Sequence, residues 1–121
     1  RDVAVTGVQT CALPILCLRQ GGFLSLVKAP PEHMVRPSAS VLFRSVAAVH
    51  GAAAAAILFS GMGRDGASEL KRLRDLGAAT FAQDKESSVV WGMPGEAVRL
   101  DAAEHIGPPS VLASLLLEHL R

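Results

Sequence analysis

The sequence contains few aromatic residues: four phenylalanines, one tryptophan and no tyrosine among 121 residues. Proteins that bind single-stranded nucleic acid stack the bases on aromatic side chains, and so few rings form no such platform. An excess of charge of one sign is also missing, because 12 Lys and Arg against 11 Asp and Glu leave a net charge of +1. This balance creates no field that steers nucleic acid or anionic lipid toward the protein. We therefore expect no nucleic-acid partner.

Long hydrophobic runs and cysteines are scarce too. The longest uninterrupted apolar run covers residues 52–59, far short of the roughly 20 residues that a membrane-spanning helix needs. We therefore expect no membrane insertion. The two cysteines, Cys11 and Cys17, have neither metal-ligand nor redox-motif spacing. This predicts a chain without a bound metal, in a reducing, cytoplasmic compartment.

What the sequence does contain is a strand, a glycine-rich turn and a helix in succession. The apolar run 52–59 predicts a strand buried on both faces of a parallel sheet. Residues 61–66 form the turn, and residues 67–76 have the spacing of a helix with one apolar face. Strand–loop–helix units place their chemistry at the carboxyl end of the strand. Asp65 is the only acidic residue in this turn, so its role largely decides the function.

The remaining patterns predict one small α/β domain around this unit. Two short strands around a glycine pair, residues 16–18 and 23–27, indicate a hairpin. A strand at 79–82 after the helix completes a crossover, which should be parallel and right-handed. The loop 83–88 should then lie beside the glycine turn. Other predicted elements are a helix beginning at Ser38 or Ser40, a helix from Pro94 to Leu100, an edge strand at 105–108 and a closing amphipathic helix. The four histidines, His33 among them, are interpreted as structural or exposed.

The glycine turn permits two further interpretations. Residues 61–66 satisfy G-x-G-x-x-G, so a nucleotide-binding α/β domain is possible, with Arg64 and Asp84 contacting the cofactor. Against it, a carboxylate at Asp65 would compete with a pyrophosphate for the amides at the start of the next helix. Alternatively, Asp65 is a simple N-cap in a non-catalytic interaction module.

Residues 61–67, Gly-Met-Gly-Arg-Asp-Gly-Ala, resemble the signature of the CheB-type catalytic domain of chemotaxis-receptor methylesterases. Three more segments resemble the family in the same order along the chain: residues 30–43, 82–90 and 92–97. The similarity extends from about Gly22 to the C-terminus. Four ordered segments make the resemblance far more specific than the glycine motif alone.

The resemblance implies a three-layer α/β sandwich with a mainly parallel sheet. It also implies a serine hydrolase that removes methyl groups from glutamate methyl esters on chemoreceptors and often deamidates receptor glutamines, without a cofactor. Its triad is Ser-His-Asp, and Asp65 matches the acid. The backbone amide of Met62, in a loop supported by Gly61 and Gly63, matches an oxyanion donor. The implied partner is a methylated chemoreceptor, and a receiver or methyltransferase domain can accompany the catalytic domain.

The first fifteen residues depart from the family because they resemble a translated sequencing adapter. We therefore expect a fold truncated at the N-terminus, with residues 16–121 as the C-terminal part of the catalytic domain. The family's serine and histidine precede the matched region, and Ser60 matches a different position. The 121-residue chain is accordingly expected to be inactive, and to be poorly soluble or oligomeric because residues 52–59 expose an unpaired edge.

Overall fold

A computed structural model describes residues 15–28, 30 and 38–121 of the chain. The expected adapter-derived segment, apart from Ile15, lies outside these ranges, and so do Pro31, His33, Arg36 and Pro37. The elements described are β1 (Ile15–Arg19), β2 (Phe23–Val27), α1 (Ala39–Val49), β3 (Ala55–Leu58), α2 (Ala67–Asp75), β4 (Ala79–Gln83), α3 (Met93–Arg99), β5 (His105–Gly107) and α4 (Pro109–His119).

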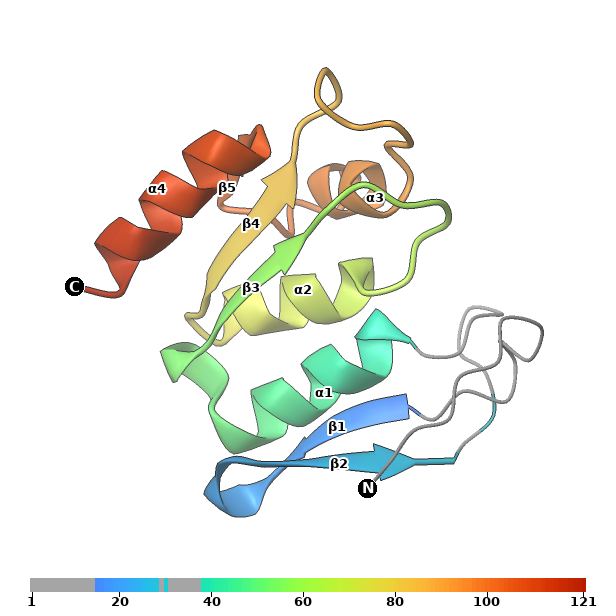
Figure 1. The fold of residues 1–121 in the computed structure, drawn as a ribbon, viewed down its shortest axis with the longest axis vertical. Coiled ribbons are helices and arrows are strands. Elements are labelled where there is room, and N and C mark those ends of the chain that lie inside the picture. The colour runs from blue at the N-terminus through green and yellow to red at the C-terminus, as the bar shows by residue number, and fades with distance from the viewer. Residues whose placement is uncertain (1–14, 29, 31–37) are drawn as a thin grey trace.

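These elements form an α/β structure with a three-stranded parallel sheet in the order β3-β4-β5. Helices α2 and α3 cover one face of this sheet and α4 covers the other (Figure 1). The predicted three-layer architecture is confirmed. The predicted hairpin is confirmed as well, since β1 and β2 pair antiparallel over their whole length and α1 lies between them and α2 (Figure 1).

The core is divided by β4, every residue of which is buried. On one face, Leu70 and Leu73 of α2 are fully buried in a cluster with Leu58 and Phe43. On the other face, Phe81 packs against Leu112 of α4. The helical spacing in the sequence therefore identified the buried face of α2 correctly. None of the helices in the described ranges is long and apolar enough to cross a membrane.

The strand expected at residues 52–59 is shorter and less buried than predicted. Residues 51–53 form a 3₁₀ turn, and β3 covers only Ala55–Leu58. Ala56 and Leu58 are buried, but Ala55 is exposed and Ile57 only half-buried. The reason is that β3 lies at the edge of the described sheet, where helix α4 lies over β4 rather than over β3 (Figure 1). The expected unpaired edge is thus present among the described strands.

Candidate functional site

The loops that follow β3 and β4 meet at the carboxyl edge of the sheet, as the crossover predicts. Gly61 is the point of contact. Its amide donates to the carbonyl of Val90 at 2.9 Å, and its carbonyl accepts from the amides of Gly92 and Met93 at 3.0 and 2.8 Å. These bonds form an isolated parallel bridge between Gly61 and Trp91. The glycine turn is therefore fixed at its base by the neighbouring loop.

A buried glutamine strengthens this junction. Gln83, the last residue of β4, is 7% exposed. Its side-chain carbonyl accepts from the Ser60 amide at 2.8 Å, and its side-chain amide donates to the Ser87 carbonyl at 2.9 Å. Trp91 Nε1 donates to the Gln83 backbone carbonyl at 2.8 Å. We did not identify this residue from the sequence, although a polar residue ending a fully buried strand could have indicated it.

The path of the glycine turn depends on missing side chains at two positions. A Cβ on Gly92 would lie 2.7 Å from the Gly61 carbonyl oxygen and 2.8 Å from the Gly63 nitrogen. A Cβ essentially never comes within 3.0 Å of another residue's atoms in this way, so only glycine allows the two loops to touch here. Gly63 itself has φ of +91°, in the left-handed region that other residues rarely adopt.

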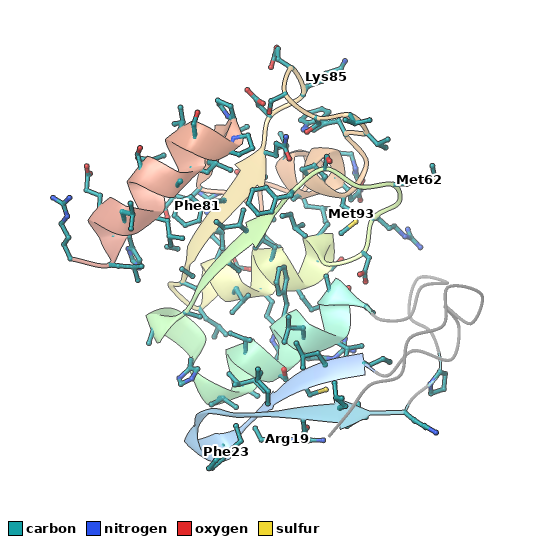
Figure 2. The ribbon with its side chains drawn as sticks, viewed as in Figure 1. Arg19, Phe23, Met62, Phe81, Lys85 and Met93 are labelled. Atoms are coloured by element: carbon teal, nitrogen blue, oxygen red, sulfur yellow. The ribbon has the colours of Figure 1, made fainter. Side chains whose placement is uncertain are left out.

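Met62 lies at the outer bend of this turn (Figure 2), and the residue is 80% exposed. Its backbone amide makes no hydrogen bond to any residue that the structure describes. The amides of Gly63, Arg64 and Asp65 likewise donate to no residue that the structure describes, so the glycine turn presents several unoccupied N–H groups. An unoccupied N–H in a fixed loop can stabilise an oxyanion that develops beside it.

Asp65 is 6% exposed and binds the start of α1. Its Oδ1 accepts from Ser38 Oγ at 2.6 Å and from the Ser40 amide at 3.2 Å. Its Oδ2 accepts from the Ala39 amide at 2.5 Å. The carboxylate therefore caps a helix that begins 26 residues earlier in the chain.

This geometry corrects two expectations from the sequence. Asp65 does not cap the helix that follows it, because its hydrogen bonds to described residues all go to the start of α1, and the N-cap residue of α2 is Gly66. The expected competition between Asp65 and a pyrophosphate at that helix is also wrong, since the carboxylate lies at α1 instead. Ser38 does occupy the N-cap position of α1, but its hydroxyl donates to Asp65 and makes no capping bond.

The residues proposed for a nucleotide do not gather in one pocket. The Asp84 carboxylate accepts bonds from the Ser87 amide, at 3.1 Å, and from the Ser87 hydroxyl. Arg64 lies elsewhere, in a hollow of about 350 Å³ lined by Arg64, Ser68, Glu96, Arg99 and Leu100. The two residues that the nucleotide hypothesis assigns to the cofactor therefore do not line this hollow together.

Within that hollow the charges are partly paired. The Arg99 guanidinium donates to both carboxylate oxygens of Glu96, at 2.9 and 2.5 Å. This hydrogen bond lowers the pKa of Glu96 and raises the pKa of Arg99, and the nearby Arg64 charge lowers the pKa of Glu96 further. The hollow therefore holds an ion pair with one additional cation beside it.

No histidine binds Asp65 in the described part of the chain. His105 stacks on Phe81 with ring centroids 5.2 Å apart, which agrees with a structural role. Nor do the described residues contain a group of three or more side chains that could hold a metal ion. What the structure brings together is a hydrogen-bonded buried carboxylate and a fixed loop with a free amide.

Comparisons with known proteins agree on one family. The family model described as CheB methylesterase matches residues 5–116. The chain is 51% identical over 108 residues to protein-glutamate methylesterase/protein-glutamine glutaminase 4 of Geobacter metallireducens, covering 86% of this chain and 31% of that protein. It is 58% identical over 95 residues to the corresponding protein of Nitrosospira multiformis, covering 78% and 27%.

A solved structure is similar in fold. The crystal structure of the Thermotoga maritima CheB methylesterase catalytic domain superposes with a TM-score of 0.82 at 29% identity. The match covers 87% of this chain and 57% of that chain. The chain thus spans between a quarter and a third of the length of these curated relatives, and more than half of one solved catalytic domain.

Proposed function

The chain belongs to the CheB methylesterase family, and from this premise we propose that it forms the acid-bearing part of a protein-glutamate methylesterase catalytic domain. The reaction is hydrolysis of glutamate methyl esters on a methylated chemoreceptor, with deamidation of receptor glutamines as the second activity. One observation carries the proposal. A buried carboxylate, Asp65, is fixed four residues from Gly61, where the loops after β3 and β4 meet.

In this proposal Asp65 is the acid of a Ser-His-Asp triad. It accepts a hydrogen bond from the histidine, holds the required tautomer and stabilises the imidazolium that forms when the histidine takes the serine proton. The serine oxygen attacks the ester carbonyl carbon, methanol leaves with that proton, and water then hydrolyses the acyl-enzyme. With a glutamine substrate, ammonia leaves instead. Serine and histidine belong to another part of the domain.

The amide of Met62 is the proposed oxyanion donor. The negative charge develops on the former carbonyl oxygen in the tetrahedral intermediate, and a donor fixed in advance stabilises it without reorganisation. Gly61 and Gly63 support the loop, and the hydrogen bonds of Gly61 with Gly92 and of Ser60 with Gln83 fix its base. Removal of one such donor typically lowers kcat about 10²- to 10³-fold.

The domain organisation follows the same proposal. Residues 16–121 form the C-terminal part of the catalytic domain, and residues 1–15 are derived from an adapter. A receiver or methyltransferase domain can accompany the catalytic domain in the whole protein, which acts in the cytoplasm on the receptor's methylated segment. None of the proposed steps requires a metal or a nucleotide.

A chimera tests this function. Residues 16–121 replace the matching segment of the Geobacter metallireducens relative, and methanol release from a methylated receptor is measured. We expect an active chimera, a loss of about 10⁴-fold on Asp65→Asn because the histidine tautomer is no longer held, and no activity from the 121-residue chain alone. Full activity of the Asp65→Asn chimera would favour the non-catalytic interaction module, in which Asp65 only caps α1.

The isolated chain gives an independent check. Ester hydrolysis by the purified 121-residue chain that disappears on Asp65→Ala would refute its proposed inactivity. A rise in its melting temperature with nicotinamide or flavin nucleotides would favour the nucleotide-binding alternative, in spite of the engaged Asp84.

A further inference from the structure

The Asp65 carboxylate has one hydrogen-bonding position left. A carboxylate offers about four lone-pair positions, two on each oxygen. Oδ1 uses both, for Ser38 Oγ and the Ser40 amide, and Oδ2 uses one, for the Ala39 amide. All four residues lie at a single junction between α1 and the glycine turn, and both serines are almost fully buried. With respect to the described residues, the acceptor position left for a further donor is therefore on Oδ2.

We propose that the first turn of α1 positions the catalytic acid and selects Oδ2 as the oxygen that receives the histidine. Ser38 is the positioning residue, because its hydroxyl completes the saturation of Oδ1. The inference rests on the proposed role of Asp65 as the triad acid. It assigns to residues 38–40 a function that neither their local sequence nor the glycine motif indicates.

Electrostatics favours this arrangement before any histidine arrives. A buried carboxylate is costly unless it is hydrogen-bonded. Here two backbone amides at the start of an 11-residue helix point at it, where the helix dipole stabilises negative charge. The acid is thus oriented by the fold itself.

Gly66, the residue after the acid, also fixes the junction between α1 and the glycine turn. The Gly66 amide donates to Ser40 Oγ at 2.8 Å. Gly66 has φ of +88°, and a Cβ there would lie 3.2 Å from Ala39 Cβ and 3.1 Å from the Leu58 side chain. The residue after the acid therefore fits closely between α1 and β3, so a shift of α1 would move the carboxylate with it.

The test uses the chimera with Ser38→Ala. The expected result is a decrease in kcat of roughly 10- to 100-fold, the effect of one hydrogen bond to a charged group, with KM changed less than about 2-fold. Loss of the hydroxyl concentrates negative charge on the carboxylate, which raises the histidine pKa. The acid limb of the kcat/KM profile should therefore move to higher pH, by about 0.5 unit.

Three variants make the result specific. Ser38→Thr keeps the hydroxyl. It should restore most of kcat and return the acid limb of the kcat/KM profile to its original pH. Ser38→Gly removes the hydroxyl but suits an N-cap position, so it replaces Ser38→Ala if that variant does not fold. Ser45→Ala is the matched control, because this serine of the same helix accepts from the Leu18 amide at 2.8 Å and donates to the Leu42 carbonyl, not to Asp65. It should lower the melting temperature without moving the pH limb.

The outcomes separate the two proposals. If Asp65→Asn abolishes activity while Ser38→Gly keeps both kcat and the pH limb, the positioning role is overturned and the proposed function stands. If Ser38→Thr behaves like Ser38→Ala, the hydroxyl is not the relevant group and the inference fails. If Asp65→Asn is fully active, the proposed function itself fails.

Discussion

At the scale of single residues, Asp65 connects two parts of the chain that local sequence does not relate. Its carboxylate replaces the missing side-chain cap of α1 and receives the Ser38 hydroxyl, while Ser40 binds back to Gly66. A residue with this many partners is structural whether or not it is catalytic. Loss of activity on Asp65→Ala would thus combine two effects, and stability has to be measured with it.

Asp65→Ala should lower the free energy of unfolding of the 121-residue chain by about 1–3 kcal/mol. It removes a helix cap and leaves the buried Ser38 hydroxyl without its acceptor. Urea unfolding followed by circular dichroism measures the change. Asp65→Asn keeps one oxygen acceptor, so its free energy of unfolding should lie between those of Asp65→Ala and the wild type.

The matched control is Asp75→Ala, because Asp75 pairs with Lys71 in solvent at the end of α2. Exposed pairs of this kind contribute less than about 1 kcal/mol. An Asp65→Ala chain as stable as the Asp75→Ala chain would contradict the capping role of Asp65.

Gln83→Leu should loosen the glycine turn without disturbing the sheet. The apolar side chain of similar size leaves the Ser60 amide and the Ser87 carbonyl unpaired, at a cost of about 1–3 kcal/mol. Hydrogen exchange read by NMR should then be faster at the amides of Ser60 and Gly61 and unchanged at α4. The exposed Gln20 provides the control as Gln20→Leu. If the amides of Ser60 and Gly61 exchange at the same rate in the Gln83→Leu and Gln20→Leu variants, Gln83 is not the residue that fixes the glycine turn.

At the scale of elements, the site depends on how two loops and one helix end fit together. The parallel pairing of β3 with β4 brings the glycine turn and the loop 83–92 to one edge. The packing of α1 on α2 brings the first turn of α1 under Asp65, with Phe43 beside Gly66. The acid and the free amide of Met62 are consequently held by different contacts, and each can be perturbed alone.

Gly92→Ala should displace the loop that bears Met62 without changing the contacts of Asp65. Its Cβ would meet the Gly61 carbonyl oxygen at 2.7 Å, so the loop that bears the oxyanion donor must move. In the chimera we expect kcat to fall about 10²-fold, as for loss of one oxyanion donor. Gly107→Ala in β5, where the nearest atom would be a Val111 methyl group at 3.4 Å, is the control. Unchanged kcat in the Gly92→Ala chimera would argue against Met62 as the donor.

At the scale of the whole molecule, the three layers are present but one strand edge is open. β3 pairs only with β4 among the described strands, and Phe59 at its end is 50% exposed. Exposed strand edges beside apolar surface promote association between chains. The hairpin adds Phe23 and Leu24 as further exposed apolar residues.

We therefore expect the 121-residue chain to associate at micromolar concentration in light scattering. Phe59→Ser should shift the distribution toward monomer, because it removes apolar surface at the open edge. Leu117→Ser is the control, because Leu117 is also exposed but belongs to α4, which packs on β4 and not at the open edge of β3. A monodisperse monomer that unfolds cooperatively would contradict the expectation.

The sequence by itself determined the α/β class, the hairpin, the parallel crossover and the place of the glycine turn. Each of these follows from local patterns, since periodicity reports which face of an element is buried and glycine reports where the backbone must turn. The same patterns overestimated the length and the burial of the strand at 52–59. An alanine run does not distinguish a central strand from an edge strand preceded by a 3₁₀ turn.

Only the tertiary structure decided the partners of the polar site residues. Asp65 caps α1 rather than α2, and Gln83 joins two loops, through contacts between residues 23 to 27 positions apart. No periodicity encodes such pairs, because a carboxylate or amide can be satisfied by any donor that the packing of helices and strands places nearby. The sequence identified which residues carry the chemistry, and the packing of α1 against the glycine turn determined how the acid is held.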